Sequence, residues 1–195
     1  MSIDKSSIYF SQLQNEDKIL ISKLLDMINT CENKHMPKFS FFLDERQCKL
    51  AGDTLKAERF HNYLFFGGFE DAKRKVLGVF PEYTLPNEQE SPIVAVKFSY
   101  RKLDKLSHKD FLGAIMSHQI KRDILGDILV NEGNSVAFIY NTVSDFLISE
   151  IKKIGSVGVK LSIENERNFV VNESFEIING TVSALRTDAI LSLAI

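Results

Sequence analysis

The residues best suited to chemistry gather between positions 106 and 130, where a histidine lies close to two carboxylates. His108 precedes Asp110 by two residues, and Asp127 follows in the same stretch. A histidine oriented by a carboxylate is the arrangement of a general base. Such a base needs a nucleophile, and the sequence contains neither a G-x-S-x-G motif nor a similarly placed cysteine. We therefore favour a capping role for His108 near a helix start, keep an RNA contact as the alternative, and expect no enzyme activity.

Basic residues are concentrated in the same region. Residues 101–125 carry six Lys or Arg and three Asp, although the whole chain has a formal charge of -2. The six are Arg101, Lys102, Lys105, Lys109, Lys121 and Arg122. Local clustering of cations is what a phosphate backbone requires, because each neutralised phosphate releases counterions. We predict an exposed patch in which Lys121 and Arg122 join Lys109, with a solvated helix face as the alternative.

Glycines at two places could serve a ligand or the fold. Gly67-Gly68 does not fit the phosphate-loop pattern G-x-x-x-x-G-K-[ST], so we predict that it forms a tight turn. Gly113 falls inside a predicted helix, where glycine costs about 1 kcal/mol relative to alanine. Close packing of this helix against a neighbour is the favoured explanation, and a backbone surface open to a phosphate is the alternative.

The composition excludes several classes of protein. Two cysteines, Cys31 and Cys48, fit neither a disulfide framework nor a zinc site, and they favour a reducing compartment. No stretch approaches the roughly 18 apolar residues of a membrane span, and the N-terminus lacks the apolar core of a signal peptide. We expect a cytoplasmic protein with no metal, no cofactor, no membrane contact and no small-molecule substrate.

The second half of the chain alternates strands and helices in a legible order. Strands are predicted at 93–98, 127–130, 135–140 and 157–163. A helix capped by Ser107 follows the first strand, and a helix capped by Asn141 or Thr142 and closed by Gly155 follows the third. The order β-α-β-β-α-β predicts a ferredoxin-like, RRM-like domain. This arrangement serves many unrelated functions, so it does not decide the function.

The first half predicts a smaller α/β unit. A helix is expected from Glu16 to Thr30, a strand at 62–66, and a second helix from Glu70 to Val76 after the two glycines. The segment 81–92 contains three of the four prolines, which suggests a linker near 84–92. The fold class is therefore α+β. We predict an N-terminal α/β domain at 1–86, a ferredoxin-like domain at 87–165, a connector at 166–184 and the beginning of a further domain at 185–195.

Several motifs together resemble one family. The most specific is the run from Leu106 to Ala114, LSHKDFLGA, which precedes Lys121-Arg122 and the triplet Gly126-Asp127-Ile128. Other matching blocks, in order, are Phe42-Leu43-Asp44 with Arg46-Gln47, Gly67-Gly68-Phe69 with Ala72 and Arg74, and Lys153-Ile154-Gly155. These blocks resemble the YlmH family of S4-domain RNA-binding proteins, and they cover the chain from about residue 39 to its end.

The resemblance implies a function in RNA binding. In that family a C-terminal S4 domain follows the RRM-like domain, and Leu185 to Leu191 resembles the opening of S4. We therefore expect the chain to stop just inside an incomplete S4 domain. The implied partners are rRNA or tRNA on the large ribosomal subunit, in rescue or quality control. The expected RNA contacts are His108, Lys109, Lys121, Arg122 and Arg186, while Asp110, Gly113, Gly126 and Asp127 shape the backbone. The alternative is a protein-interaction module that docks on a ribosomal or cell-division protein and leaves RNA to the missing S4 domain.

Overall fold

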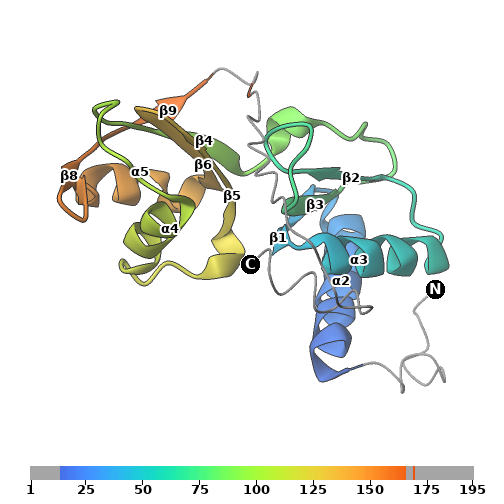
Figure 1. The fold of residues 1–195 in the computed structure, drawn as a ribbon. Coiled ribbons are helices and arrows are strands. Elements are labelled where there is room, and N and C mark those ends of the chain that lie inside the picture. Colours follow the sequence, from blue (N-terminus) through green and yellow to red (C-terminus); the bar gives the residue numbers. More distant parts are fainter. Residues whose placement is uncertain (1–13, 166–168, 170–195) are drawn as a thin grey trace, which may run out of the picture.

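The computed structural model describes residues 14–165 and 169 of the chain, which form two lobes side by side (Figure 1). Both lobes are mixed α/β structures with antiparallel sheets. The first lobe comprises α2 (Asn15–Lys34), β1 (Lys38–Leu43), α3 (Glu45–Ala57), β2 (Tyr63–Phe66) and β3 (Lys75–Val79). The second comprises β4 (Ile93–Ser99), α4 (His108–Met116), η2 (Arg122–Ile124), β5 (Leu125–Asn131), β6 (Asn134–Tyr140), α5 (Asn141–Glu150), β7 (Lys153–Ile154), β8 (Val157–Gly158) and β9 (Lys160–Glu164).

The first lobe is a three-stranded antiparallel sheet in the order β1-β3-β2, with helices α2 and α3 against it. Leu24 and Ile28 of α2 and Leu55 of α3 share a buried core with Leu77 and Val79 of the central strand. Burial of these side chains supplies the main stabilisation of the lobe.

The predicted helix from Glu70 to Val76 is wrong. The chain turns through these positions and enters β3 at Lys75, which pairs with both β1 and β2. A central strand is buried on both faces, so Val76, Leu77 and Val79 are all buried and show no period-2 alternation. A short apolar run of this kind cannot be distinguished from a helix by periodicity alone.

The second lobe is a four-stranded antiparallel sheet in the order β5-β6-β4-β9. Helices α4 and α5 cover one face, where Phe111, Ile115 and Leu147 pack against Phe98 and Ile139. The prediction that Gly155 closes α5 is wrong. The helix ends at Glu150, and Gly155, with a φ of 58°, lies in the turn between β7 and β8.

The two lobes share a third core. Phe42, Phe66 and Val76 of the first lobe pack against Ala95 and Phe138 of the second. The segment predicted as a linker contains the short helix η1 (Glu88–Glu90) and joins β3 to β4. The two lobes are therefore held together by direct apolar contact as well as by the segment that connects them.

Some predictions fall outside the described residues. They are the connector at 166–184, apart from Phe169, the S4-like stretch 185–195, and Arg186. Within the described part of the chain, no helix combines the length and the apolar character that crossing a membrane requires.

Candidate RNA-binding surface at the junction of the lobes

The face of the second sheet opposite its helices is the first place to look for RNA, because four-stranded sheets of this kind stack bases on exposed aromatic side chains. Here the middle of that face is covered. Phe138 of β6 is 1% exposed, and the ring of Phe69 stacks on it with centroids 4.9 Å apart. Phe42 and Phe66 of the first lobe belong to the same buried cluster. The Phe138 ring is therefore not exposed for base stacking while the lobes are packed in this way.

A set of hydrogen bonds joins the lobes beside this core. The Asp127 carboxylate on β5 accepts from the backbone N–H of Lys73 at 2.6 Å and of Arg74 at 3.2 Å. The Arg74 guanidinium donates to the carbonyls of Leu125 at 3.1 Å, Phe42 at 3.3 Å and Arg122 at 3.4 Å. The loop before β3 is thereby fastened to the start of β5.

Two glycines let the lobes approach closely. A Cβ on Gly126 would lie 2.5 Å from the ring of Phe42, and one on Gly68 would lie 2.3 Å from the ring of Phe138. Gly68 also has a φ of 97°, which side chains rarely tolerate. The turn predicted at Gly67-Gly68 is therefore present, and Gly68 also allows close contact between the lobes.

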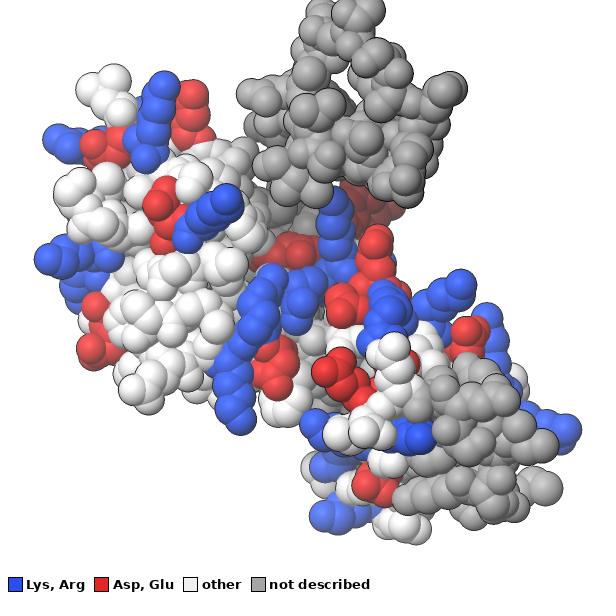
Figure 2. All heavy atoms as spheres, turned by 60° about the horizontal axis from the view of Figure 1, so that its bottom comes forward, with Lys and Arg blue, Asp and Glu red and all other residues white. Residues whose placement is uncertain are grey.

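This fastening places two basic segments together. Lys73 and Arg74 precede β3, whereas Lys121 and Arg122 lie immediately before β5. We call these four residues the junction cluster. Figure 2 shows Lys and Arg side chains gathered where the lobes meet, with Asp and Glu side chains among them. Lys73 and Lys121 are exposed, so their ammonium groups can reach a phosphate.

Arg122 is held more tightly than the sequence suggested. Its guanidinium donates to the carbonyls of Leu125 and Gly126, and burial lowers its pKa, with Arg74 nearby lowering it further. Both arginines of the junction cluster thus act mainly on the backbone, and they contribute a fixed positive field. The two lysines are the exposed cations of the junction cluster.

Acidic and phenolic groups lie within the same region. Among the buried side-chain nitrogen and oxygen atoms of the described residues, Oδ1 of Asp123 is the one without a hydrogen-bond partner. Burial raises the pKa of Tyr140, and Asp123 raises it further. The Tyr140 hydroxyl donates to the Ser40 carbonyl of the first lobe. The Tyr140 hydroxyl therefore stays protonated at any physiological pH, and it forms a neutral hydrogen bond between the lobes.

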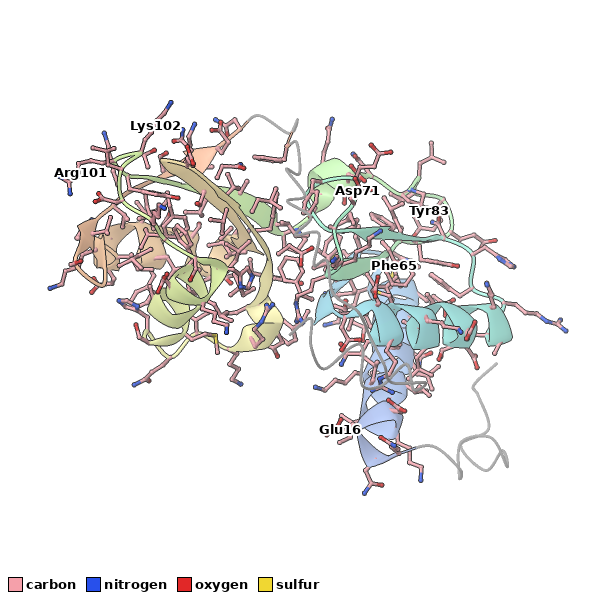
Figure 3. All side chains as sticks on the ribbon, viewed as in Figure 1. Glu16, Phe65, Asp71, Tyr83, Arg101 and Lys102 are labelled. Atoms are coloured by element: carbon pink, nitrogen blue, oxygen red, sulfur yellow. The ribbon has the colours of Figure 1, made fainter. Side chains whose placement is uncertain are left out.

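The residues predicted to form one patch, Lys109 with Lys121 and Arg122, lie toward opposite ends of α4. Lys109 lies in the first turn of the helix, and at a rise of about 1.5 Å per residue it is about 10 Å along the axis from Met116. Lys121 follows only after a further turn. Arg101 and Lys102 lie at the end of the second lobe away from the first (Figure 3), and Arg101 pairs with Asp104 at 2.9 Å.

His108 lies exposed at the start of α4, where Ser107 and Asp110 form the predicted capping box. The Ser107 backbone and hydroxyl donate to Asp110 at 2.7 and 2.6 Å, and these bonds lower the pKa of Asp110. Both carboxylates proposed as orienters of His108 therefore accept bonds from other groups, Asp127 from the lobe junction. Among residues 14–165 and 169, no group of three or more His, Cys, Asp or Glu could hold a metal ion.

Gly113 does not pack closely against a neighbour, contrary to the favoured explanation. A Cβ at this position would have no atom within 4 Å, and the residue is exposed. The alternative, an open backbone surface on α4, agrees with this geometry.

Sequence reasoning missed Lys73 and Arg74 as parts of the junction. The available signal was the motif from Gly67 to Arg74. It is one of the motifs that resemble the family, and it lies in the chain between the motifs around Phe42 and Gly126. The motif that begins at Phe42 also has a local structural role. Asp44 and Gln47 form a capping box for α3, and Arg46 binds both carboxylate oxygens of Asp17 on α2.

Fold and surface define a protein of mixed α/β structure that presents a basic junction beside a covered sheet. Residues 86–168 match the family described as "Putative RNA-binding domain in YlmH". Over 188 residues, 95% of this chain and 72% of the relative, the chain is 29% identical to the "ribosome-associated protein quality control protein P2" of Bacillus subtilis (strain 168).

A solved structure shows the same fold. The "cell division protein ylmH" from Streptococcus pneumoniae matches with a TM-score of 0.66 at 24% identity, over 78% of this chain and 93% of that one. These findings confirm the resemblance to the YlmH family that the sequence motifs predict.

Proposed function

We propose that the protein is an RNA-binding adaptor that associates with the ribosome. The observation that carries this proposal is the match of residues 86–168 to an RNA-binding domain family. The name of the Bacillus subtilis relative, a ribosome-associated quality control protein, supports the ribosomal setting. The junction cluster supplies cations for a phosphate backbone in a chain that is otherwise slightly acidic.

The finer assignment follows the same line. The strand order β5-β6-β4-β9 under two helices supports a ferredoxin-like, RRM-like second domain. We propose rRNA or tRNA of the large subunit as the ligand, in the rescue or quality control of stalled subunits, in the cytoplasm. An S4 domain would add further RNA contacts. The protein would act by binding and not by catalysis.

The mode of binding follows from the geometry of the junction. Lys73 and Lys121 would contact phosphates, while Arg74 and Arg122 hold the backbone that presents them. Bases would not stack on the covered sheet. Recognition would therefore depend on the shape and charge of the RNA more than on its sequence.

Replacement of Lys73 and Lys121 by alanine tests this proposal. The double variant should bind ribosomal RNA more weakly. The negative slope of log K against log salt should become shallower by roughly 0.7–0.9 for each lost phosphate contact. Lys160→Ala, on the exposed edge of β9, is the matched control. A separate Lys109→Ala variant tests the other end of α4. An unchanged salt slope in the double variant would reject the junction cluster as the RNA surface.

The alternative is docking on a ribosomal or cell-division protein. Exposed apolar side chains on the first lobe favour it: Met36 is 57% exposed, Tyr83 72% and Leu85 86%. The ring of Tyr83 lies 5.7 Å from that of His35, next to Met36, and Figure 3 shows Tyr83 on the outside of this lobe. Tyr83→Ser with Leu85→Ser should abolish cosedimentation with ribosomes if protein contact dominates. The lysine double variant should abolish it if RNA contact dominates.

A further inference from the structure

A groove of about 560 Å³ lies where β4 and β9 of the second lobe meet the turn between β2 and β3 of the first. Its aromatic side chains come from both lobes and from beyond β9. They are Phe65, Phe66, Phe69, Phe138 and Phe169. A concave surface of this size that contains several aromatic side chains is typical of a binding site.

The charges of the groove do not suit RNA. Glu70, Glu88 and Glu164 line it, against the single lysine Lys75. Glu164 is paired with Lys97 at 3.0 Å, which leaves two carboxylates on the rim. A phosphate backbone would meet repulsion here, so the groove favours an apolar side chain.

One such side chain is already seated in it. Phe169 follows the end of β9 by five residues, and its ring meets that of Phe138 edge-on, with centroids 5.0 Å apart and planes at 89°. Phe69 stacks on the same Phe138 ring, so three rings from three segments form one cluster. Edge-on and offset contacts are the favourable geometries for aromatic rings.

We propose that this groove is the docking site for the chain's own segment after β9, with Phe169 as its anchor. The anchor would hold the chain at residue 169 against side chains of both lobes. Whatever follows would then be positioned relative to both lobes, not tethered loosely to one. This inference does not depend on RNA binding.

The absence of tryptophan from the chain gives a clean test. In the full-length protein, Phe169→Trp introduces a single reporter, whose emission should be blue-shifted and protected from acrylamide. Tyr83→Trp, at a side chain that is 72% exposed, provides the solvent-exposed reference. Adding Phe69→Ala to the Phe169→Trp variant should shift the emission to the red and increase quenching, because one wall of the site is lost.

A second measurement avoids the larger tryptophan ring. Phe169→Ala should speed amide exchange in residues 66–70 by about tenfold, because local opening becomes easier. Phe146→Ala, at a side chain 47% exposed on α5, should leave this exchange unchanged. Emission of Phe169→Trp equal to that of Tyr83→Trp, or exchange unaffected by Phe169→Ala, would overturn the proposal. Saturable displacement of the tryptophan by single-stranded RNA would also overturn it, because the groove would then be a nucleic-acid site.

Discussion

Asp127 illustrates how a residue chosen for its chemistry can serve the fold. A carboxylate near a histidine suggests catalysis, yet this one accepts two backbone N–H groups from the other lobe. The sequence correctly indicated a role in shaping the backbone, but the backbone that it shapes is 53 and 54 residues away along the chain. Nothing in its own sequence neighbourhood names that partner.

We predict that Asp127→Ala lowers the free energy of unfolding by about 1–2 kcal/mol, because the N–H groups of Lys73 and Arg74 lose their acceptor. Urea unfolding measures the change. Asp145→Ala, on the exposed side of α5, should stay within about 0.5 kcal/mol of the wild type. Equal stabilities of the Asp127 variant and the wild type would show that the junction does not depend on this carboxylate.

At the scale of the elements, the second half of the chain was predicted well because its periodicities are clear. Strands β4 and β6 and helix α4 lie close to their expected positions, whereas the strand predicted at 157–163 is divided into β8 and β9. The first half was harder, since β3 is buried on both faces and lacks alternation. Pairing across the lobes could not be predicted, because it depends on shape complementarity between Gly126 and Phe42 that no local pattern encodes.

Two glycines of the second lobe should respond in opposite ways to alanine. Gly113→Ala should stabilise the protein by up to about 1 kcal/mol, because α4 gains helix propensity and the new Cβ meets no atom within 4 Å. Gly126→Ala should destabilise it by about 1–3 kcal/mol, because its Cβ would overlap the Phe42 ring. Thermal unfolding of both variants checks the pair, and destabilisation by Gly113→Ala would contradict the open surface on α4.

For the whole molecule, the shared core predicts that the lobes unfold together. Phe42, Phe66 and Phe138 lose their packing as soon as either lobe opens. Amide exchange in the cores of both lobes should therefore report one free energy of opening. Arg74→Met should separate the two values, with the first lobe opening more easily. Separate values in the wild type would show that the lobes are independent domains.

The junction cluster joins parts of the chain that the sequence presents as separate. The linker near 84–92 and the basic stretch 101–125 suggested two domains with one basic helix. The contacts of Arg74 and Asp127 show instead that the surface is assembled from segments of both lobes. For the RNA binding proposed above, a surface held by contacts from both lobes would favour recognition of a folded RNA by its shape.

We propose that RNA contacts the junction cluster and not the covered sheet. Ultraviolet crosslinking of the full chain to ribosomal RNA, with mass spectrometry of the attached peptides, tests it most directly. We predict that, within the two lobes, crosslinks lie in residues 71–75 and 117–124 and are lost when Lys73 and Lys121 are replaced by alanine. Crosslinks on the rings of Phe69 or Phe138, or crosslinks in the lobes confined to residues 101–110, would contradict the account.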